Sequence, residues 1–156
     1  MWQRAFKEAA ARNPGIRSTH LYVDAAAMRF VSDPSEFDVI VTNNSYGDIL
    51  SDLAAMLAGG LGNAASANIN PVTGFGLYEP VHGSAPDIAG KGIGNPFGAI
   101  LSSALMLEHL GWAHEADALR RAVGTAIAEG QVTPDLGGPL GTKEAGEAVR
   151  KALAAR

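Results

Sequence analysis

Residues 37–58 read FDVIVTNNSYGDILSDLAAMLA, and their character changes twice along this run. Residues 37–42 are apolar and rich in β-branched side chains, which is typical of a short buried parallel strand. A polar corner follows at residues 43–47, and an amphipathic helix is expected from Asp48 to about Ala58. A strand, a corner and a helix in this order form an α/β unit, and such sheets bind ligands at the carboxyl ends of their strands. The run therefore predicts an α/β fold with a ligand site at the polar corner.

The rest of the chain adds helices and one long loop region. Residues 59–94 are rich in Gly, Asn, Ser and Pro, and only residues 77–81 look like a strand there. A loop region of this length is uncommon in a compact domain and usually has a function. Pro96 is typical of a first helical turn, and Thr142 is predicted to cap the last helix. The expected helices cover residues 2–12, 24–31, 95–110, 113–129 and 142 onward, and a further strand is expected at residues 16–23.

The composition indicates one soluble domain of ordinary size. The chain has 156 residues, of which 47% are apolar, and its 12 basic and 16 acidic residues give a formal net charge of -4. This balance offers no basic stripe for a phosphate backbone, so nucleic acid is not an expected partner. The absence of cysteine excludes disulfides and thiolate metal sites and favours the cytoplasm. Neither a membrane span nor a signal peptide is expected, because the apolar stretches are short and carry glycines.

Asp48 and Asp52 are candidate metal ligands. They are four residues apart, so on a helix their carboxylates leave the same face one turn apart. Most aspartate pairs at this spacing are simply solvated. The expected position of Asp48 at a helix start, where free amides and the helix dipole favour anions, strengthens the metal interpretation. Carboxylate oxygens without cysteine or paired histidine favour Mg²⁺ or Mn²⁺ over zinc.

The run HGSAPD at residues 82–87 is a candidate dinucleotide site. Small residues with free backbone amides let phosphates approach closely. An aspartate such as Asp87 can accept hydrogen bonds from both ribose hydroxyls and repels a 2′-phosphate. Composition alone favours an ordinary glycine-rich surface loop, and the chain has neither a G-x-G-x-x-G fingerprint nor a G-x-x-x-x-G-K-[ST] phosphate loop. A dinucleotide site of the Rossmann type is therefore not predicted.

The histidines and Ser84 form no clear catalytic constellation. His109 and His114 are expected at the surface or as capping residues near helix ends, and His20 is expected to be packed or at an interface. Ser84 has no histidine and aspartate at the spacing of a hydrolase triad. A hydrolase is thus only a remote alternative.

Four motifs carry a resemblance to a known enzyme family. They are YVD at residues 22–24, NSYGDILSD at 44–52, EPVHGSAPDIAGKGI at 79–93 and TPDLGG at 133–138. Together they resemble the isopropylmalate/isocitrate/homoisocitrate/tartrate dehydrogenase family. The resemblance implies the three-layer α/β/α fold of this family, with this chain as its C-terminal half. Residues 1–60 would then be part of the central dimerisation and metal-binding domain, and residues 61–156 the C-terminal part of the NAD-binding terminal domain.

The resemblance implies a metal site shared between two subunits. Asp48 and Asp52 would coordinate Mg²⁺ or Mn²⁺ beside the substrate, while Asp24 would reach the same metal in the neighbouring subunit of a homodimer. The implied substrate is a small 2-hydroxy di- or tricarboxylate similar to 3-isopropylmalate. In this family the metal chelates the 2-hydroxyl and 1-carboxylate, and the 2-oxo acid left by hydride transfer loses its β-carboxylate. Isocitrate, homoisocitrate, and tartrate or malate remain alternative substrates.

The resemblance also implies NAD as the cofactor. NADP-using relatives carry Lys-Tyr where this chain has Asp87 and Ile88. Asp87 would bind the adenosine ribose, and Ile88 and Asn95 would pack around the adenine. Two positions depart from the family pattern, Ser45 where a large apolar residue is usual and Gly94 where alanine is common. The full expected cofactor-binding set is Glu79, His82, Gly83, Ser84, Ala85, Asp87, Ile88 and Asn95.

The catalytic residues of this family are expected outside the chain. Family members are considerably longer, and Met1 lines up just after the segment of the catalytic lysine. The arginines that clamp the substrate, the tyrosine acid and the substrate-selecting helix also lie upstream, so no catalytic residue is assigned here. We expect little or no turnover from the chain alone. The alternative outside the enzyme class is a truncated paralogue that persists as a dimerising or NAD-binding module.

Overall fold

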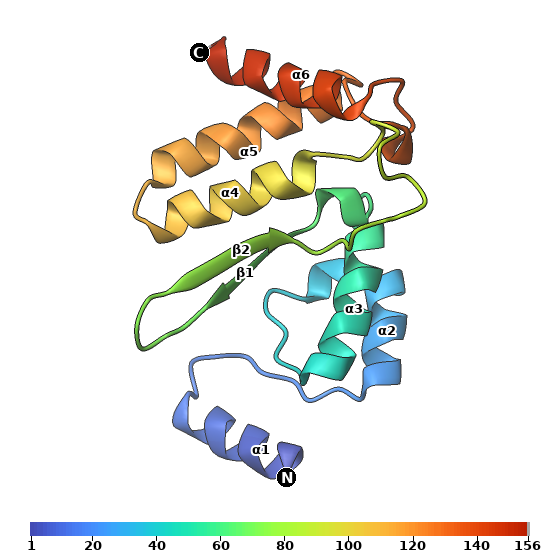
Figure 1. Ribbon diagram of the computed structural model, residues 1–156. Helices are drawn as coiled ribbons and strands as arrows, with labels where there is room; N and C mark the ends of the chain where they lie inside the picture. The colour runs from blue at the N-terminus through green and yellow to red at the C-terminus, as the bar shows by residue number, and fades with distance from the viewer. Residues whose placement is uncertain (156) are drawn as a thin grey trace. The chain divides into compact units, whose positions relative to one another are not determined.

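The computed structural model describes residues 1–155, which form two units, Met1–Ala54 and a second unit that begins at Ala55. The predicted boundary near residue 60 refers to domains of the whole family fold and stays a prediction. None of the described helices is long and apolar enough to cross a membrane. In chain order the elements in Figure 1 are α1 (Trp2–Arg12), α2 (Val23–Ser32), α3 (Asn44–Leu57), β1 (Ala65–Ile69), β2 (Gly76–Pro80), α4 (Phe97–His109), α5 (Ala113–Ala128) and α6 (Thr142–Ala154), with short 3-10 helices at Pro34–Glu36, Leu61–Asn63 and Pro134–Leu136.

The first unit has a small apolar core between α2 and α3. Its buried residues are Ala26 and Phe30 of α2 and Leu50 of α3. The ring of Phe37 stacks on that of Phe30, with ring centroids 4.6 Å apart. This core leaves much apolar surface uncovered. The large apolar side chains exposed in this unit include Ile16, Met28, Val31, Val39, Val41 and Ile49.

Helix α1 has no buried residue and contacts the segment that precedes α2. The Gln3 side chain donates a hydrogen bond to the Tyr22 hydroxyl at 3.0 Å. The His20 ring meets the rings of Phe6 and Tyr22 edge-on, with centroids 5.7 and 5.5 Å apart. His20 therefore contacts two aromatic rings but stays exposed, and its predicted place at an interface stays a prediction.

The two strands predicted in the first unit are not formed. Residues 16–22 and 38–43 have no strand pairing, and Val39 and Val41 are 84% and 83% exposed. A strand is completed only by backbone hydrogen bonds to a neighbouring segment. The described part of this unit contains no segment that pairs with either run. The prediction of a buried parallel strand at residues 37–42 is therefore wrong for this chain by itself.

Helix α3 begins at Asn44, one turn earlier than predicted. The side-chain oxygen of Asn43 accepts a hydrogen bond from the Tyr46 N–H at 3.0 Å, and the Asn43 carbonyl accepts one from the Gly47 N–H at 2.8 Å. Asparagine suits this position because its side chain satisfies an amide that the first turn leaves free. The predicted polar corner is thus a capped first turn, and Asp48 lies inside the helix.

The second unit packs a two-stranded sheet and three helices against one another. β1 and β2 pair antiparallel, with Ala65 opposite Pro80 and Ile69 opposite Gly76. Helix α4 contacts both strands and α5, and α5 contacts α6. Figure 1 shows α4 between the hairpin and α5. β2 confirms the predicted strand at residues 77–81 to within one residue. The run ASANI of β1 has a low strand propensity, because alanine and asparagine are uncommon in strands, and it is a strand here because β2 pairs with it.

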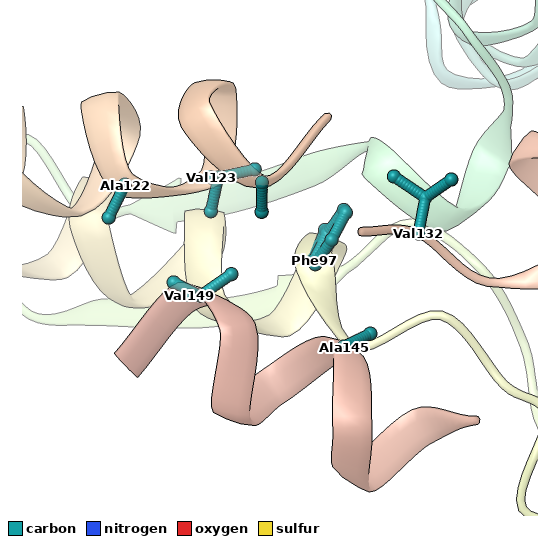
Figure 2. Packing of buried hydrophobic residues seen from close by; sticks show 7 residues of the cluster. Phe97, Ala122, Val123, Val132, Ala145 and Val149 are labelled. Atoms are coloured by element: carbon teal, nitrogen blue, oxygen red, sulfur yellow. The ribbon is translucent and has the colours of Figure 1, made fainter. Parts of the chain in front are cut away.

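The core of the second unit lies where α4, α5 and α6 meet (Figure 2). Phe97 at the start of α4 is fully buried, and burial of a side chain of this size stabilises the fold by about 1.5–3 kcal/mol. Gly98 allows α4 to pack closely against the 3-10 turn before β1. A Cβ at Gly98 would lie 3.0 Å from the Gly62 carbonyl oxygen and 3.1 Å from that of Ala64. The buried members of this core are Phe97, Ala122, Val123, Ala126, Val132, Ala145 and Val149.

Thr142 does not cap α6 in the predicted way. It is the first residue of the helix, and the N-cap position is Gly141. The Thr142 hydroxyl donates to the Gly94 carbonyl at 2.6 Å, and its backbone N–H donates to the Gly92 carbonyl at 2.8 Å. Thr142 therefore ties the start of α6 to the long loop that precedes α4.

Candidate functional site

The two aspartates predicted to bind a metal lie on one face of α3. Asp48 and Asp52 are one turn apart, and both are exposed. One carboxylate oxygen of Asp48 accepts a hydrogen bond from the Asn44 side-chain amide at 3.0 Å. None of the ion pairs in the described part of the chain involves either aspartate. The negative charge of this pair is therefore available to a cation.

The helix start does not contribute to this pair as predicted. The amides that α3 leaves free belong to its first turn, and Asn43 already satisfies the one at Tyr46. The helix dipole acts mainly within the first turn, and Asp48 lies beyond it. The case for a metal thus rests on the paired carboxylates and not on the helix terminus.

Asp24 lies in the first turn of α2 and is exposed. One of its carboxylate oxygens accepts a hydrogen bond from the Ala25 N–H at 2.8 Å. Among the described residues no three His, Cys, Asp or Glu side chains converge, so Asp24 does not complete a site with Asp48 and Asp52 inside one chain. The two carboxylates of α3 nevertheless fit Mg²⁺ or Mn²⁺, because Mg²⁺ is usually held by one or two carboxylates plus water and substrate oxygens. The role of Asp24 in a second subunit stays a prediction.

The predicted cofactor residues form one run from β2 to the start of α4. Glu79 is exposed in β2 opposite Ser66. The Val81 N–H donates to the Ala64 carbonyl at 3.1 Å, which extends the pairing by one residue. Residues 82–87 then leave the sheet and are all exposed. At Gly83 a Cβ would meet no atom within 4 Å, so the backbone there is open to an approaching ligand.

The backbone turns sharply within this run. Ala85 has a φ of 40°, a left-handed conformation that residues other than glycine rarely adopt. The Ile88 N–H donates to the Ala85 carbonyl at 3.0 Å, and the Lys91 N–H donates to the Ile88 carbonyl at 3.1 Å. Such backbone strain is common in ligand-binding segments. Small exposed residues followed by the exposed carboxylate of Asp87 fit the phosphates and the ribose of a dinucleotide.

The run ends at two half-buried residues of the predicted set, Ile88 and Asn95. The side chain of Asn95 is held by Asn63 and Asp135, two residues that were not predicted to belong to the site. Asp135 lies in the motif TPDLGG at residues 133–138, which supports the family resemblance but does not indicate a contact with Asn95.

The clearly shifted pKa values belong to surface ion pairs on the helices of the second unit. A hydrogen bond to Glu108 raises the pKa of Arg120, and Asp117 adds to this effect. The guanidinium of Arg150 donates two hydrogen bonds to Glu147, at 2.7 and 2.6 Å, and lowers the pKa of that carboxyl. These groups stabilise helix surfaces and lie outside the predicted site.

Comparison of the sequence with known protein families identifies the family of this chain. Residues 1–149 match the sequence profile of the isocitrate/isopropylmalate dehydrogenase family. The chain belongs to this family. It is 50% identical over 155 residues to the 3-isopropylmalate dehydrogenase of Anaeromyxobacter dehalogenans, covering 99% of this chain and 44% of that enzyme. It is 54% identical over 139 residues to the 3-isopropylmalate dehydrogenase of Methanothermobacter thermautotrophicus, covering 89% of this chain and 42% of that enzyme.

Solved structures of the family confirm the predicted fold. The chain matches isocitrate dehydrogenase from Methylococcus capsulatus with a TM-score of 0.90 and 49% identity, covering 94% of this chain and 44% of that one. It matches a β-decarboxylating dehydrogenase from Thermococcus kodakarensis with a TM-score of 0.84 and 40% identity, covering 98% of this chain and 45% of that one. The chain therefore has the fold of the C-terminal part of these dehydrogenases and spans less than half of their length.

Proposed function

We propose that this chain is the metal-binding and NAD-binding part of a dehydrogenase that oxidises and decarboxylates 3-isopropylmalate, a step of leucine biosynthesis. The observation that carries the proposal is the 50% identity to a named 3-isopropylmalate dehydrogenase over 155 residues. The isocitrate dehydrogenase of Methylococcus capsulatus is 49% identical, which keeps isocitrate as the first alternative substrate. Homoisocitrate and tartrate or malate follow as further alternatives. We place the enzyme in the cytoplasm as a homodimer.

Asp48 and Asp52 would hold Mg²⁺ or Mn²⁺, with Asp24 supplied by a second copy of the chain. When bound, such an ion would stabilise negative charge on the substrate's oxygen atoms, both when its hydroxyl loses a proton before hydride transfer and when carbon dioxide leaves. Two carboxylates neutralise the double positive charge of the ion. The hydrogen bond from Asn44 restrains the Asp48 side chain, which favours a fixed ligand position.

Residues 82–87 would hold NAD. The exposed backbone of Gly83, Ser84 and Ala85 offers N–H donors to the pyrophosphate, and their small side chains permit a close approach. Asp87 would accept hydrogen bonds from the ribose hydroxyls and repel the extra phosphate of NADP. The half-buried side chain of Ile88 offers apolar surface to the adenine. Glu79, His82 and Asn95 complete the proposed cofactor-binding set.

Mixing the chain with the upstream part of a related enzyme tests this proposal. NADH formation is measured for the chain alone and for the chain mixed with the upstream part of the Anaeromyxobacter dehalogenans enzyme, each with 3-isopropylmalate, isocitrate, Mn²⁺ and NAD. We expect turnover only in the mixture, preferentially with 3-isopropylmalate. Asp52→Asn should abolish it, whereas Asp38→Asn, the same change at another exposed aspartate of the first unit, should not.

Three results would contradict the proposal. Full turnover by the chain alone would show that no further catalytic residues are needed. Turnover of isocitrate but not of 3-isopropylmalate would replace the substrate. A mixture without turnover, together with no binding of NAD or Mn²⁺ by the chain, would favour a dimerising remnant without catalytic function.

A further inference from the structure

A polar network joins three separate segments of the second unit. Asn63 comes from the turn before β1, Asn95 precedes α4, and Thr133 and Asp135 belong to the TPDLGG motif. One amide nitrogen, Nδ2 of Asn95, donates to Oδ1 of Asn63 at 3.1 Å and to Oδ2 of Asp135 at 3.0 Å. The Thr133 hydroxyl donates to Oδ1 of Asp135 at 2.5 Å. Both carboxylate oxygens of Asp135 therefore have partners inside the unit.

The side-chain amide of Asn95 has no free donor. Its two N–H bonds are directed to Asn63 and Asp135, and its oxygen accepts a hydrogen bond from the Phe97 N–H at 2.9 Å. An asparagine amide has only two N–H donors, so both are used. A ligand therefore cannot receive a hydrogen bond from this amide unless the network opens. The network fixes the Asn95 side chain and leaves ligand contact to other parts of the residue and its neighbours.

The surroundings of Asp135 hold it in place. Thr133 is fully buried, so its hydroxyl is a fixed donor. A Cβ at Gly62 would lie 2.5 Å from Oδ2 of Asp135 and 2.8 Å from Cβ of Asn95. Any side chain at position 62 would therefore collide with Asp135 and Asn95, and glycine is required for this close packing. Asp135 is itself exposed, but the buried Thr133 holds one of its carboxylate oxygens while the other accepts from Asn95.

The same C-terminal region also holds the loop just before Asn95. Thr142 donates from its N–H to the Gly92 carbonyl at 2.8 Å and from its hydroxyl to the Gly94 carbonyl at 2.6 Å. Hydrogen bonds from Thr142 and to Asp135 therefore hold the segment 92–95 at Gly92, Gly94 and Asn95. The end of the run that we assign to NAD is thus positioned by residues far along the chain, 40 residues away for the Asn95–Asp135 contact and 48 for the Gly94–Thr142 contact.

We propose that Asp135 is a positioning residue for the proposed NAD-binding run, residues 82–95. Asp135 holds Asn95, and with it the end of this run, in the conformation that binds the adenosine half of NAD. This inference rests on the proposed function. Asp135 touches no part of the ligand in this role. Its carboxylate acts through Asn95, so the identity of the hydrogen-bonding group matters and its charge matters less.

Two substitutions of Asp135 separate positioning from simple charge. Asp135→Ala removes both acceptors, so the Thr133 hydroxyl loses its acceptor and Asn95 keeps only its hydrogen bonds with Asn63 and the Phe97 N–H. Asp135→Asn keeps one acceptor for Asn95, and its amide can donate to the Thr133 hydroxyl, which rotates to accept. AMP, NAD and Mn²⁺ are titrated separately into the wild-type chain and both variants. Asp117→Ala is the matched control, because Asp117 is an exposed aspartate of the same unit that accepts from Arg120 at 3.2 Å.

We expect Asp135→Ala to weaken AMP and NAD by a similar factor of about ten, the size expected for loss of a hydrogen bond to a charged group. Asp135→Asn should restore most of the affinity, and Asp117→Ala should leave it unchanged. Mn²⁺ binding should be the same in all variants. Wild-type affinity for AMP in Asp135→Ala, even with a lower melting temperature, would overturn the proposal and leave the network a purely structural role.

A second readout does not depend on the ligand. Hydrogen exchange of the Phe97 amide reports whether Asn95 still accepts its hydrogen bond. We expect faster exchange at Phe97 in Asp135→Ala and near wild-type exchange in Asp135→Asn. If the wild-type chain binds neither AMP nor NAD, the cofactor proposal fails. Whether or not the chain binds a ligand, unchanged exchange of the Phe97 amide in Asp135→Ala would show that Asp135 does not hold Asn95.

Discussion

The two units of this chain differ in how completely each is folded by its own residues. In the second unit both strands find a partner, and Phe97 and Thr133 are buried completely. In the first unit the apolar residues 39–41 pair with no other segment, and the three buried core residues keep 6–8% of their surface exposed. Helices form in both units because their hydrogen bonds are local, whereas a strand needs a second segment. The local sequence pattern thus determines where helices form, whereas a strand forms only where another segment of the unit can pair with it.

The largest difference should appear when one aromatic residue is removed from each core. Phe97→Ala should destabilise the second unit by about 3–5 kcal/mol, as expected for a fully enclosed phenylalanine. Phe30→Ala should cost the first unit less, because its small core can collapse around the gap. Urea unfolding followed by tryptophan fluorescence separates the units in variants that keep a single tryptophan, either Trp2 in the first unit or Trp112 in the second. Equal losses for the two substitutions would contradict the comparison.

Hydrogen exchange compares a valine in each unit. The Val81 N–H donates to the Ala64 carbonyl in the second unit, whereas Val41 lies in the unpaired run of the first. We expect the Val81 amide to exchange more slowly than that of Val41, by on the order of a hundredfold, because it exchanges only when the sheet opens. Strong protection of the Val41 amide would contradict this comparison, because it would mean that residues 38–42 form backbone hydrogen bonds with another segment.

Metal binding should depend on the first unit alone. Asp48→Asn and Asp52→Asn should each weaken Mn²⁺ binding by about tenfold or more, because each removes one charged ligand from a pair. Asp38→Asn removes the same charge from the same unit and should have little effect. Electron paramagnetic resonance of free Mn²⁺ measures the bound fraction directly. A loss of affinity that is the same for all three substitutions would indicate a general effect of charge and not a site.

The smallest expected effect is the acid sensitivity of the last helix. Arg150 lowers the pKa of Glu147, so the pair stabilises the folded state above the usual carboxyl pKa and loses this contribution as the pH falls through the lowered value. Glu147→Gln should flatten the dependence of the melting temperature on pH in this acidic range. Glu129→Gln, at another exposed glutamate, should retain it. An identical acid profile in wild type and Glu147→Gln would exclude the pair as its source.

The sequence predicted the helices of both units and strand β2 from local signals. Periodicity and Gly or Pro boundaries placed α1, α2, α4, α5 and α6 to within a few residues. The start of α3 was missed by one turn, although Asn43 is a favoured N-cap residue and was the available signal. β1 was missed because the residues of ASANI have a low strand propensity, and the run becomes a strand through its pairing with β2.

The sequence supplied candidate residues for the site, whose roles stay predictions, and little of the geometry around them. Spacing alone put Asp48 and Asp52 on one helix face, and the family resemblance supplied the roles proposed for residues 79–95. The contact between Asp135 and Asn95 joins residues 40 apart, and no local pattern reports such a contact. The hydroxyl of Thr142 likewise bonds Gly94 instead of its own helix, because the loop carbonyl lies within reach in the folded unit.

The most direct test is an equilibrium titration of the chain with NAD and with NADP, each in the presence of Mn²⁺. If residues 82–87 bind the dinucleotide and Asp87 faces its ribose, NAD should bind about tenfold or more tightly than NADP, and Asp87→Asn should reduce this preference. Equal affinity for the two cofactors, or no binding of either while Mn²⁺ still binds, would contradict the assignment of this segment to NAD.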